Sequence, residues 1–330
     1  MYKIDIFAHQ LMIIIGIIMF IFGLIGNILN IYVFSTWSHL KKKSKRKCNN
    51  IRSSNSSLYL LTSSISNLII IIYPFLTRII FDGFQYSIKD SNAFILCKFR
   101  YYILHTFDLI SLTCICMATF DRYLISSRKV RLRHMSTVRK QTKQVILFVF
   151  ILNSIHSIPI GFYFHVSNQN QCIIESKKFL YYYLWTFQIC LHSIIPILFL
   201  TIFGTLTYRQ LKKLKHTKRK GTLTSDKRLS RMLLLMSVAI VLSSIPYCIE
   251  HIYYIMIPND RSKQTSFIYL YHVITSLLFY VNPVTSFYIF FISTPNFRRQ
   301  VRKLIFWKRP IYHFDNESFT MITILHNLHE

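Results

Sequence analysis

Three charged residues lie within runs of mostly apolar residues, and their chemistry needs explaining first. Asp108 and Glu250 carry carboxylic acids, and Arg78 carries a guanidinium. A charge in such surroundings is costly unless it meets an opposite charge or a polar partner. We therefore expect all three side chains to face the inside of a helix bundle, where each acid pairs either with Arg78 or with a cationic group of a ligand.

The sequence lacks the residue patterns of an enzyme active site. No His, Cys or Glu cluster has metal-binding spacing, and neither a glycine-rich phosphate loop nor a Gly-x-Ser-x-Gly pattern is present. We expect no enzymatic activity, no metal and no cofactor. Seven cysteines in a chain of 330 residues indicate one or two disulfides at most.

The charged residues must be positioned by long apolar segments, because 52% of the chain is hydrophobic. A helix needs about 20 apolar residues to cross a bilayer. Seven such segments predict an all-α membrane protein whose single domain is a seven-transmembrane helix bundle. The expected spans are residues 9–36, 56–81, 96–126, 143–164, 180–208, 230–257 and 266–292.

The basic residues indicate how these spans are oriented. The loops at residues 38–55, 127–142 and 209–229 are strongly basic, whereas those at 82–95, 165–179 and 258–265 are not. Because cytoplasmic loops carry the excess of Lys and Arg, we expect a multi-pass protein of the plasma membrane with its N-terminus outside and its C-terminus in the cytoplasm. The net charge of +28 therefore reflects membrane topology, and we expect no nucleic-acid partner.

A short segment after the last span has a different periodicity. Residues 295–307 place Phe297, Val301, Leu304 and Ile305 on one helical face and basic residues around the rest. This pattern predicts a cytoplasmic amphipathic helix that contacts membrane lipids, followed by a short tail over residues 308–330. A disordered basic tail is the alternative.

The third expected span carries recognisable residues at both ends. Asp121-Arg122-Tyr123 ends it, and Cys97 lies 24 residues before Asp121, which is about 36 Å along a helix and places the two ends on opposite membrane faces. Together with polar and proline positions in the other spans, this arrangement resembles the rhodopsin-like (class A) G-protein-coupled receptor family over nearly the whole chain. The further matching positions are Gly26-Asn27, Asn67-Leu68, Pro159, Pro196, Pro246 and Asn282-Pro283.

The resemblance implies roles for several of these residues. It implies a disulfide between Cys97 and Cys172, which an oxidising outer face would preserve. It also implies that Arg122 is a switch facing a heterotrimeric G protein, with Tyr123 beside it. Asn27 and Asn67 would then be polar residues of the bundle interior.

A two-state switch explains why a charged Arg122 lies near the hydrocarbon edge. In a resting state it can pair with Asp121 and with Asp226, which lies 20 residues before Pro246 and so about 30 Å along the sixth span, at the same membrane level. Outward movement of the sixth span would break that pair. Asp226 as an exposed loop carboxylate is the alternative. Pro196, Pro246 and Asn282-Pro283 supply hinges, because each proline removes a backbone hydrogen bond.

Other positions depart from the family pattern. Asn67 replaces the acid usual in the second span, Ser244 replaces the aromatic residue two positions before Pro246, and the tryptophan usual in the fourth span is absent near Asn153. In the seventh span Ser286 replaces an expected tyrosine if Asn282-Pro283 sets the alignment. An alignment from Phe297-Arg298 would instead shift the register by one turn and leave Ser286-Phe287 where the family has Asn-Pro, and the sequence leaves both alignments open.

The outer halves of the spans indicate the ligand. Leu104 occupies the place of the Asp found in amine receptors, which argues against a biogenic amine. The pocket candidates are Leu104, Asp108, Glu250, Arg78 and Tyr254, the last from an aromatic set that is also typical of membrane interfaces. Scattered outer carboxylates favour a small basic or amidated peptide, as in the peptide-receptor branch.

Two other functions remain open from the sequence. The first is a chemosensory receptor for a small molecule, which differs from a peptide receptor in the ligands that activate it. The second is a membrane transporter, against which stand the odd number of spans and the lack of a visible inverted repeat.

Overall fold

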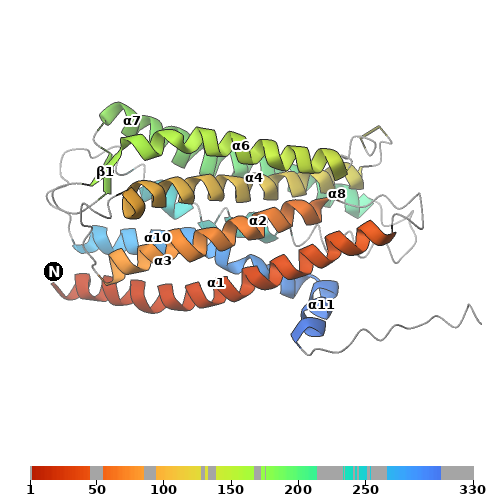
Figure 1. Ribbon diagram of the computed structural model, residues 1–330, viewed down its shortest axis with the longest axis horizontal. Helices are drawn as coiled ribbons and strands as arrows, with labels where there is room; N and C mark the ends of the chain where they lie inside the picture. Colours follow the sequence, from red (N-terminus) through yellow and green to blue (C-terminus); the bar gives the residue numbers. More distant parts are fainter. Residues whose placement is uncertain are drawn as a thin grey trace, which may run out of the picture.

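The computed structural model is a bundle of long helices that run side by side (Figure 1). It describes residues 2–44, 55–84, 94–127, 131–132, 139–166, 172–174, 176–213 and 266–305, together with residues 233, 235–240, 242–243, 245–250 and 253. Among these, six helices are long and apolar enough to cross a membrane, and a shorter apolar helix, Leu235–Glu250, lies in the expected sixth span.

The first three spans pack closely on one another. The first is α1 (Tyr2–Ser44). The second is built in sequence from α2 (Ser56–Ile70), η1 (Ile71–Phe75), α3 (Leu76–Arg78) and η2 (Ile79–Gly83). The third joins η4 (Phe94–Phe99) to α4 (Arg100–Ser126). α4 contacts α2, α6 and α8, so it is the central helix of the bundle.

The remaining spans complete the bundle around α4. α6 (Arg139–Tyr163) is the fourth span, and α7 (Lys177–Tyr182), η5 (Tyr183–Ile194) and α8 (Ile195–Lys213) form the fifth. α10 (Ser266–Ser293) packs mainly against α1. A two-stranded antiparallel hairpin, β1 (Phe164–Val166) and β2 (Cys172–Ile174), joins the fourth and fifth spans at the end of the bundle where the N-terminus lies (Figure 1).

The exposed faces of the helices are apolar, as a lipid environment requires. Ile14, Phe22 and Ile25 on α1 each have about half of their surface exposed, whereas Gly16, Gly23 and Gly26 on the other faces of α1 meet neighbouring spans. In water such a surface would be an aggregation hazard, but in a bilayer the lipid tails cover it. The interior is more polar, and α2 buries Ser63, Ser64, Ser66 and Asn67.

The second and fifth spans contain wide, π-helical turns next to prolines. η1 includes Pro74, and η5 ends at Ile194, two residues before Pro196. A proline cannot donate the regular helical hydrogen bond, and the chain adapts by local changes of helical winding. Pro196 was an expected hinge, whereas the turn at Pro74 was not expected from the sequence.

The amphipathic helix α11 (Pro295–Ile305) turns across the end of the bundle opposite the N-terminus (Figure 1). Its apolar face packs on protein at two positions, because Phe297 and Val301 are fully buried. The Phe297 ring lies within 6 Å of the rings of Phe34 and Phe290. Arg299, Arg302 and Lys303 are exposed, so the basic face remains available to lipid head groups.

Candidate functional site

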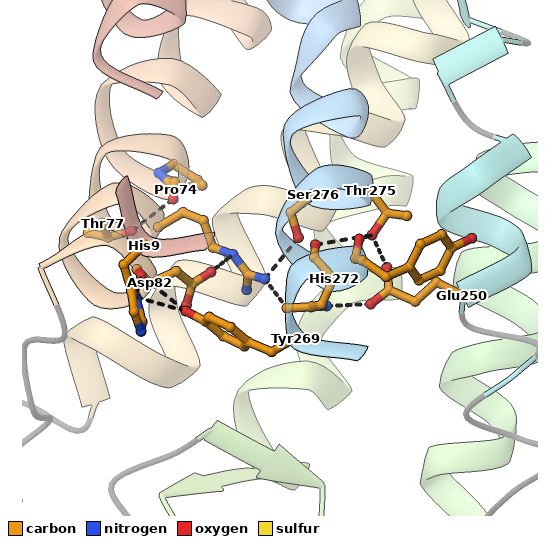
Figure 2. A network of polar contacts seen from close by, with 11 residues as sticks. His9, Pro74, Thr77, Asp82, Glu250, Tyr269, His272, Thr275 and Ser276 are labelled. Atoms are coloured by element: carbon orange, nitrogen blue, oxygen red, sulfur yellow. Dashed lines mark hydrogen bonds and ion pairs between the residues drawn. The ribbon is translucent and has the colours of Figure 1, made fainter. Parts of the chain in front are cut away.

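A polar network connects three spans near the end of the bundle where the N-terminus lies (Figure 2). His272 on α10 contacts the Glu250 carboxylate through Nδ1 and Arg78 through Nε2. Arg78 also forms a salt bridge with Asp82 and donates a 2.9 Å hydrogen bond to Ser276 Oγ. The Thr275 hydroxyl donates to the other oxygen of Glu250. One imidazole therefore joins the second span, the sixth span and α10.

Arg78 has a partner within its own span that was not expected from the sequence. Each acid was expected to pair with Arg78 or with a cationic group of a ligand, and the salt bridge of Arg78 is with Asp82, one helical turn away. Within the described contacts, His272 connects Arg78 to Glu250. The physical reason is that side chains four residues apart lie next to each other on the same helix. Asp82 can therefore contact Arg78 directly, whereas an acid on another helix must be brought close by packing.

The first span joins the same network at its edge. Tyr269 on α10 donates a 3.1 Å hydrogen bond to the Asp82 carbonyl, and its hydroxyl lies 3.1 Å from His9 Nδ1. Figure 2 shows His9, Asp82 and Tyr269 close together. The first and second spans and α10 are thus tied together by polar contacts at one level.

A second polar network lies deeper, between α4 and η5. Asp108 Oδ2 lies 2.6 Å from His192 Nδ1, and His192 Nε2 lies 3.3 Å from His105 Nδ1. His105 Nε2 lies 2.6 Å from the Tyr183 hydroxyl, which also accepts a 2.8 Å hydrogen bond from Gln188. All five side chains are buried. Asp108 therefore faces the bundle interior, where its carboxylate has a histidine partner.

The asparagines expected in the interior are buried and bonded. Asn67 accepts a 2.6 Å hydrogen bond from the Ser111 hydroxyl, which lies 2.8 Å from Ser63 Oγ. Asn27 donates to the Pro283 carbonyl at 2.9 Å, which connects α1 to the proline of α10. Asn67 therefore belongs to a hydrogen-bonded group that joins the second span to the third.

The Asp-Arg-Tyr residues meet the start of α2. The Ser56 hydroxyl donates a 2.7 Å hydrogen bond to Asp121 and accepts a 3.0 Å hydrogen bond from Arg122 Nε. The Ser56 backbone N–H donates to the same Asp121 oxygen at 3.1 Å. Tyr123 packs on Phe203 of α8, with 5.3 Å between ring centroids. Asp121 and Arg122 are both buried, and Ser56 bridges them.

A disulfide joins Cys97, in η4, to Cys172, in β2. It attaches the hairpin to the N-terminal end of the third span, so the expected pairing is confirmed. The Cys97 side chain is fully buried.

Comparison with known proteins gives the family. Residues 84–286, more than half of the chain, match the family model described as "7 transmembrane receptor (rhodopsin family)". The chain belongs to the rhodopsin family of seven-transmembrane receptors. A search of curated proteins found no match. Membership makes the chain a G-protein-coupled signalling receptor and not an enzyme.

Histidines are the site residues of this rhodopsin-family receptor that sequence reasoning missed. His105, His192 and His272 lie singly along the chain, so no local motif marks them. Their signal was their location, because each interrupts a mostly apolar span. A histidine buried in such a span needs hydrogen-bond partners, which the fold supplies from other helices.

The surroundings of two further residues expected to act in the receptor can be described, and three others lie outside the described residues. Leu104 is buried among Leu277, Tyr280 and other apolar side chains, so it contributes packing. Pro246, the expected hinge of the sixth span, lies in the described helix, and its carbonyl accepts a 3.4 Å hydrogen bond from Tyr271. Asp226, Ser244 and Tyr254 lie outside the described residues.

Proposed function

We propose that this receptor binds a small extracellular peptide and transmits the event to a heterotrimeric G protein by outward movement of its sixth span. The observation that carries the proposal is the contact between Glu250 and His272, because it joins the sixth span to α10 within a network of charged groups. A ligand with polar groups can compete for those contacts, and a ligand that binds one state more tightly shifts the receptor toward that state.

The opposite end supplies a site for the transducing partner. Asp121 and Arg122 are held by the hydroxyl of Ser56, and both are buried. Release of Arg122 from these contacts would present a cation to a G protein once the sixth span moves outward. Asp226 is a further candidate partner of Arg122 in the resting state. We expect Asp226→Asn to raise basal signalling, and unchanged basal activity at normal surface expression would remove Asp226 from the mechanism.

The test is a panel of peptides applied to cells that display the receptor, with second-messenger release as the readout. We expect at least one peptide to give a saturable response that Arg122→Ala abolishes without loss of surface display. A response only to small non-peptide molecules would favour a chemosensory receptor. Ligand-driven uptake into liposomes without any G-protein response would favour a transporter.

The proposed orientation has its own test. We expect an epitope tag at the N-terminus to be stained on intact cells, and a tag at the C-terminus to be stained only after permeabilisation. Both tags in the same compartment would contradict the arrangement, because the third span must place Cys97 and Arg122 on opposite membrane faces.

A further inference from the structure

Arg100 is a buried cation that neither polar network uses. It begins α4, three residues after the disulfide-bonded Cys97, and only 6% of its surface is exposed. Its Cζ lies 5.1 Å from the ring centroid of Phe81 and 4.7 Å from that of Tyr101. The guanidinium is therefore held against aromatic rings from the second and third spans.

The hydrogen-bonding capacity of Arg100 is incomplete. Its Nη1 is buried and has no hydrogen-bond partner, and no salt bridge within the described parts of the chain includes Arg100. Contacts with aromatic rings offset part of the cost of burying a cation, but they do not satisfy N–H groups in the guanidinium plane. Such an arginine is stabilised most by an anion whose oxygens accept hydrogen bonds in the plane of the guanidinium.

Three carboxylates in the described part of this half of the bundle already have partners. Asp82 pairs with Arg78, Glu250 with His272, and Asp108 with His192. Their charges are therefore at least partly neutralised within the protein. Arg100 differs from them, because its guanidinium keeps an N–H donor that can bind an acceptor group of a ligand.

Arg100 also lies where a ligand from outside would arrive. Its stacking partner Tyr101 packs on Phe164 of β1, 4.5 Å away between ring centroids. The disulfide fixes β2 to the same end of the third span.

We propose that Arg100 binds a carboxylate of the extracellular ligand, so that the peptide is recognised by a free C-terminal acid. This inference rests on the proposed function, because it takes the ligand to be a peptide. It differs from the expectation of a basic or amidated peptide, and among the described acids Asp82, Asp108 and Glu250 already have partners. The planar guanidinium can hold both oxygens of a carboxylate, which an ammonium group cannot do in the same geometry.

The cellular test uses a peptide panel synthesised in matched pairs, each sequence once as the free acid and once as the amide. We expect the free acid of the active sequence to be more potent by roughly 30-fold or more, because removing one partner of a buried charge pair is costly. Arg100→Gln should remove that preference, and Arg100→Lys should retain part of it. Lys98→Gln, which removes a partly exposed charge two residues away, is the matched control and should keep the preference.

A second measurement needs no active peptide. Purified receptor is heated in detergent with a thiol-reactive dye that reports exposure of the buried Cys114 and Cys116. We expect N-acetylphenylalanine at millimolar concentration to raise the unfolding temperature, and N-acetylphenylalanine amide to leave it unchanged. The shift should disappear in Arg100→Gln and persist in Lys98→Gln. If Arg100→Gln does not fold, a reduced shift in Arg100→Lys supports the same conclusion.

The outcomes separate this inference from the proposed function. Equal potency of acid and amide peptides would overturn the role of Arg100 while leaving the peptide receptor in place. A carboxylate-specific temperature shift that depends on Arg100, without activation by any peptide, would keep the anion site and reject the peptide function. Equal shifts with the acid and the amide, or a shift retained in Arg100→Gln, would reject the anion site.

Discussion

His192 Nδ1 lies 2.6 Å from Asp108 Oδ2, and this contact joins the fifth span to the third inside the bundle. Both side chains are nearly fully buried. A histidine–carboxylate contact is strong when one partner is charged, because the interior screens charge poorly. The pair thus connects the helix that carries the Asp-Arg-Tyr residues to a span that contains a proline at its centre.

We expect Asp108→Asn to lower the free energy of unfolding by about 1–3 kcal/mol, because the His192 imidazole keeps a neighbour of similar size but loses a carboxylate acceptor. Thermal unfolding of the purified receptor measures the loss. His192→Asn and the double variant complete a double-mutant cycle. If the two single losses simply add, the 2.6 Å contact contributes nothing and the prediction is wrong.

The close approach of α1 and α10 gives a second prediction. A Cβ added at Gly26 would lie 2.9 Å from the Phe287 Cβ, whereas a Cβ added at Gly161 on α6 would meet nothing within 4 Å. We expect Gly26→Ala to destabilise the receptor by about 1–3 kcal/mol, because both helix backbones must move apart. Gly161→Ala is the matched control and should be neutral or stabilising, since alanine favours a helix. Equal unfolding temperatures for the two variants would contradict this reading of the interface.

The fold was largely predictable because its dominant signal is local. Six of the apolar segments form helices that are long enough to cross a membrane, and the family resemblance implied that Cys97 pairs with Cys172. In the sequence, Gly26 could be noted only as a match to the family pattern. The sequence does not show that Phe287 of α10 lies against it. The wide turn at Pro74 also depends on how the chain adapts around a proline, which a single sequence does not specify.

The candidate site was predictable only in part, because its contacts join distant residues. Asp108, Glu250 and Arg78 were found from their charge in apolar runs, and all three lie in or beside the polar networks. Their partners were not found, because His192 and His272 lie 84 and 22 residues away from the acids they contact. Arg100 was overlooked because a basic residue next to an outer loop is ordinary, and only its burial distinguishes it.

The disulfide gives a third prediction. We expect Cys97→Ser and Cys172→Ser each to reduce surface display strongly, since loss of a native disulfide typically costs about 2–5 kcal/mol in secreted domains. The double variant should be no worse than the worse single variant, because each substitution alone already breaks the bond. Cys190→Ser, which alters a free cysteine of η5, is the control and should be displayed normally. Normal display of both single variants would show that the hairpin needs no bond to the third span.

The bridging hydroxyl of Ser56 gives the prediction closest to the signalling mechanism. It donates to Asp121 at 2.7 Å and accepts from Arg122 Nε at 3.0 Å, so Ser56→Ala removes one contact from each member of the switch. In the proposed mechanism these contacts hold Arg122 in the resting arrangement. We therefore expect basal second-messenger release to rise by about 2- to 10-fold, which corresponds to roughly 0.4–1.4 kcal/mol in the equilibrium between the two states.

Ser126→Ala is the matched control for this prediction. It removes a hydroxyl that donates to the Arg122 backbone carbonyl at 2.7 Å and to Gln210 at 3.1 Å, but it leaves the Arg122 guanidinium and both contacts of Ser56 intact. We expect its basal signalling to stay at the wild-type level when surface display is matched. If Ser56→Ala signals no more than Ser126→Ala, the Ser56 hydroxyl does not restrain Arg122, and the resting restraint must come from the other groups around that arginine.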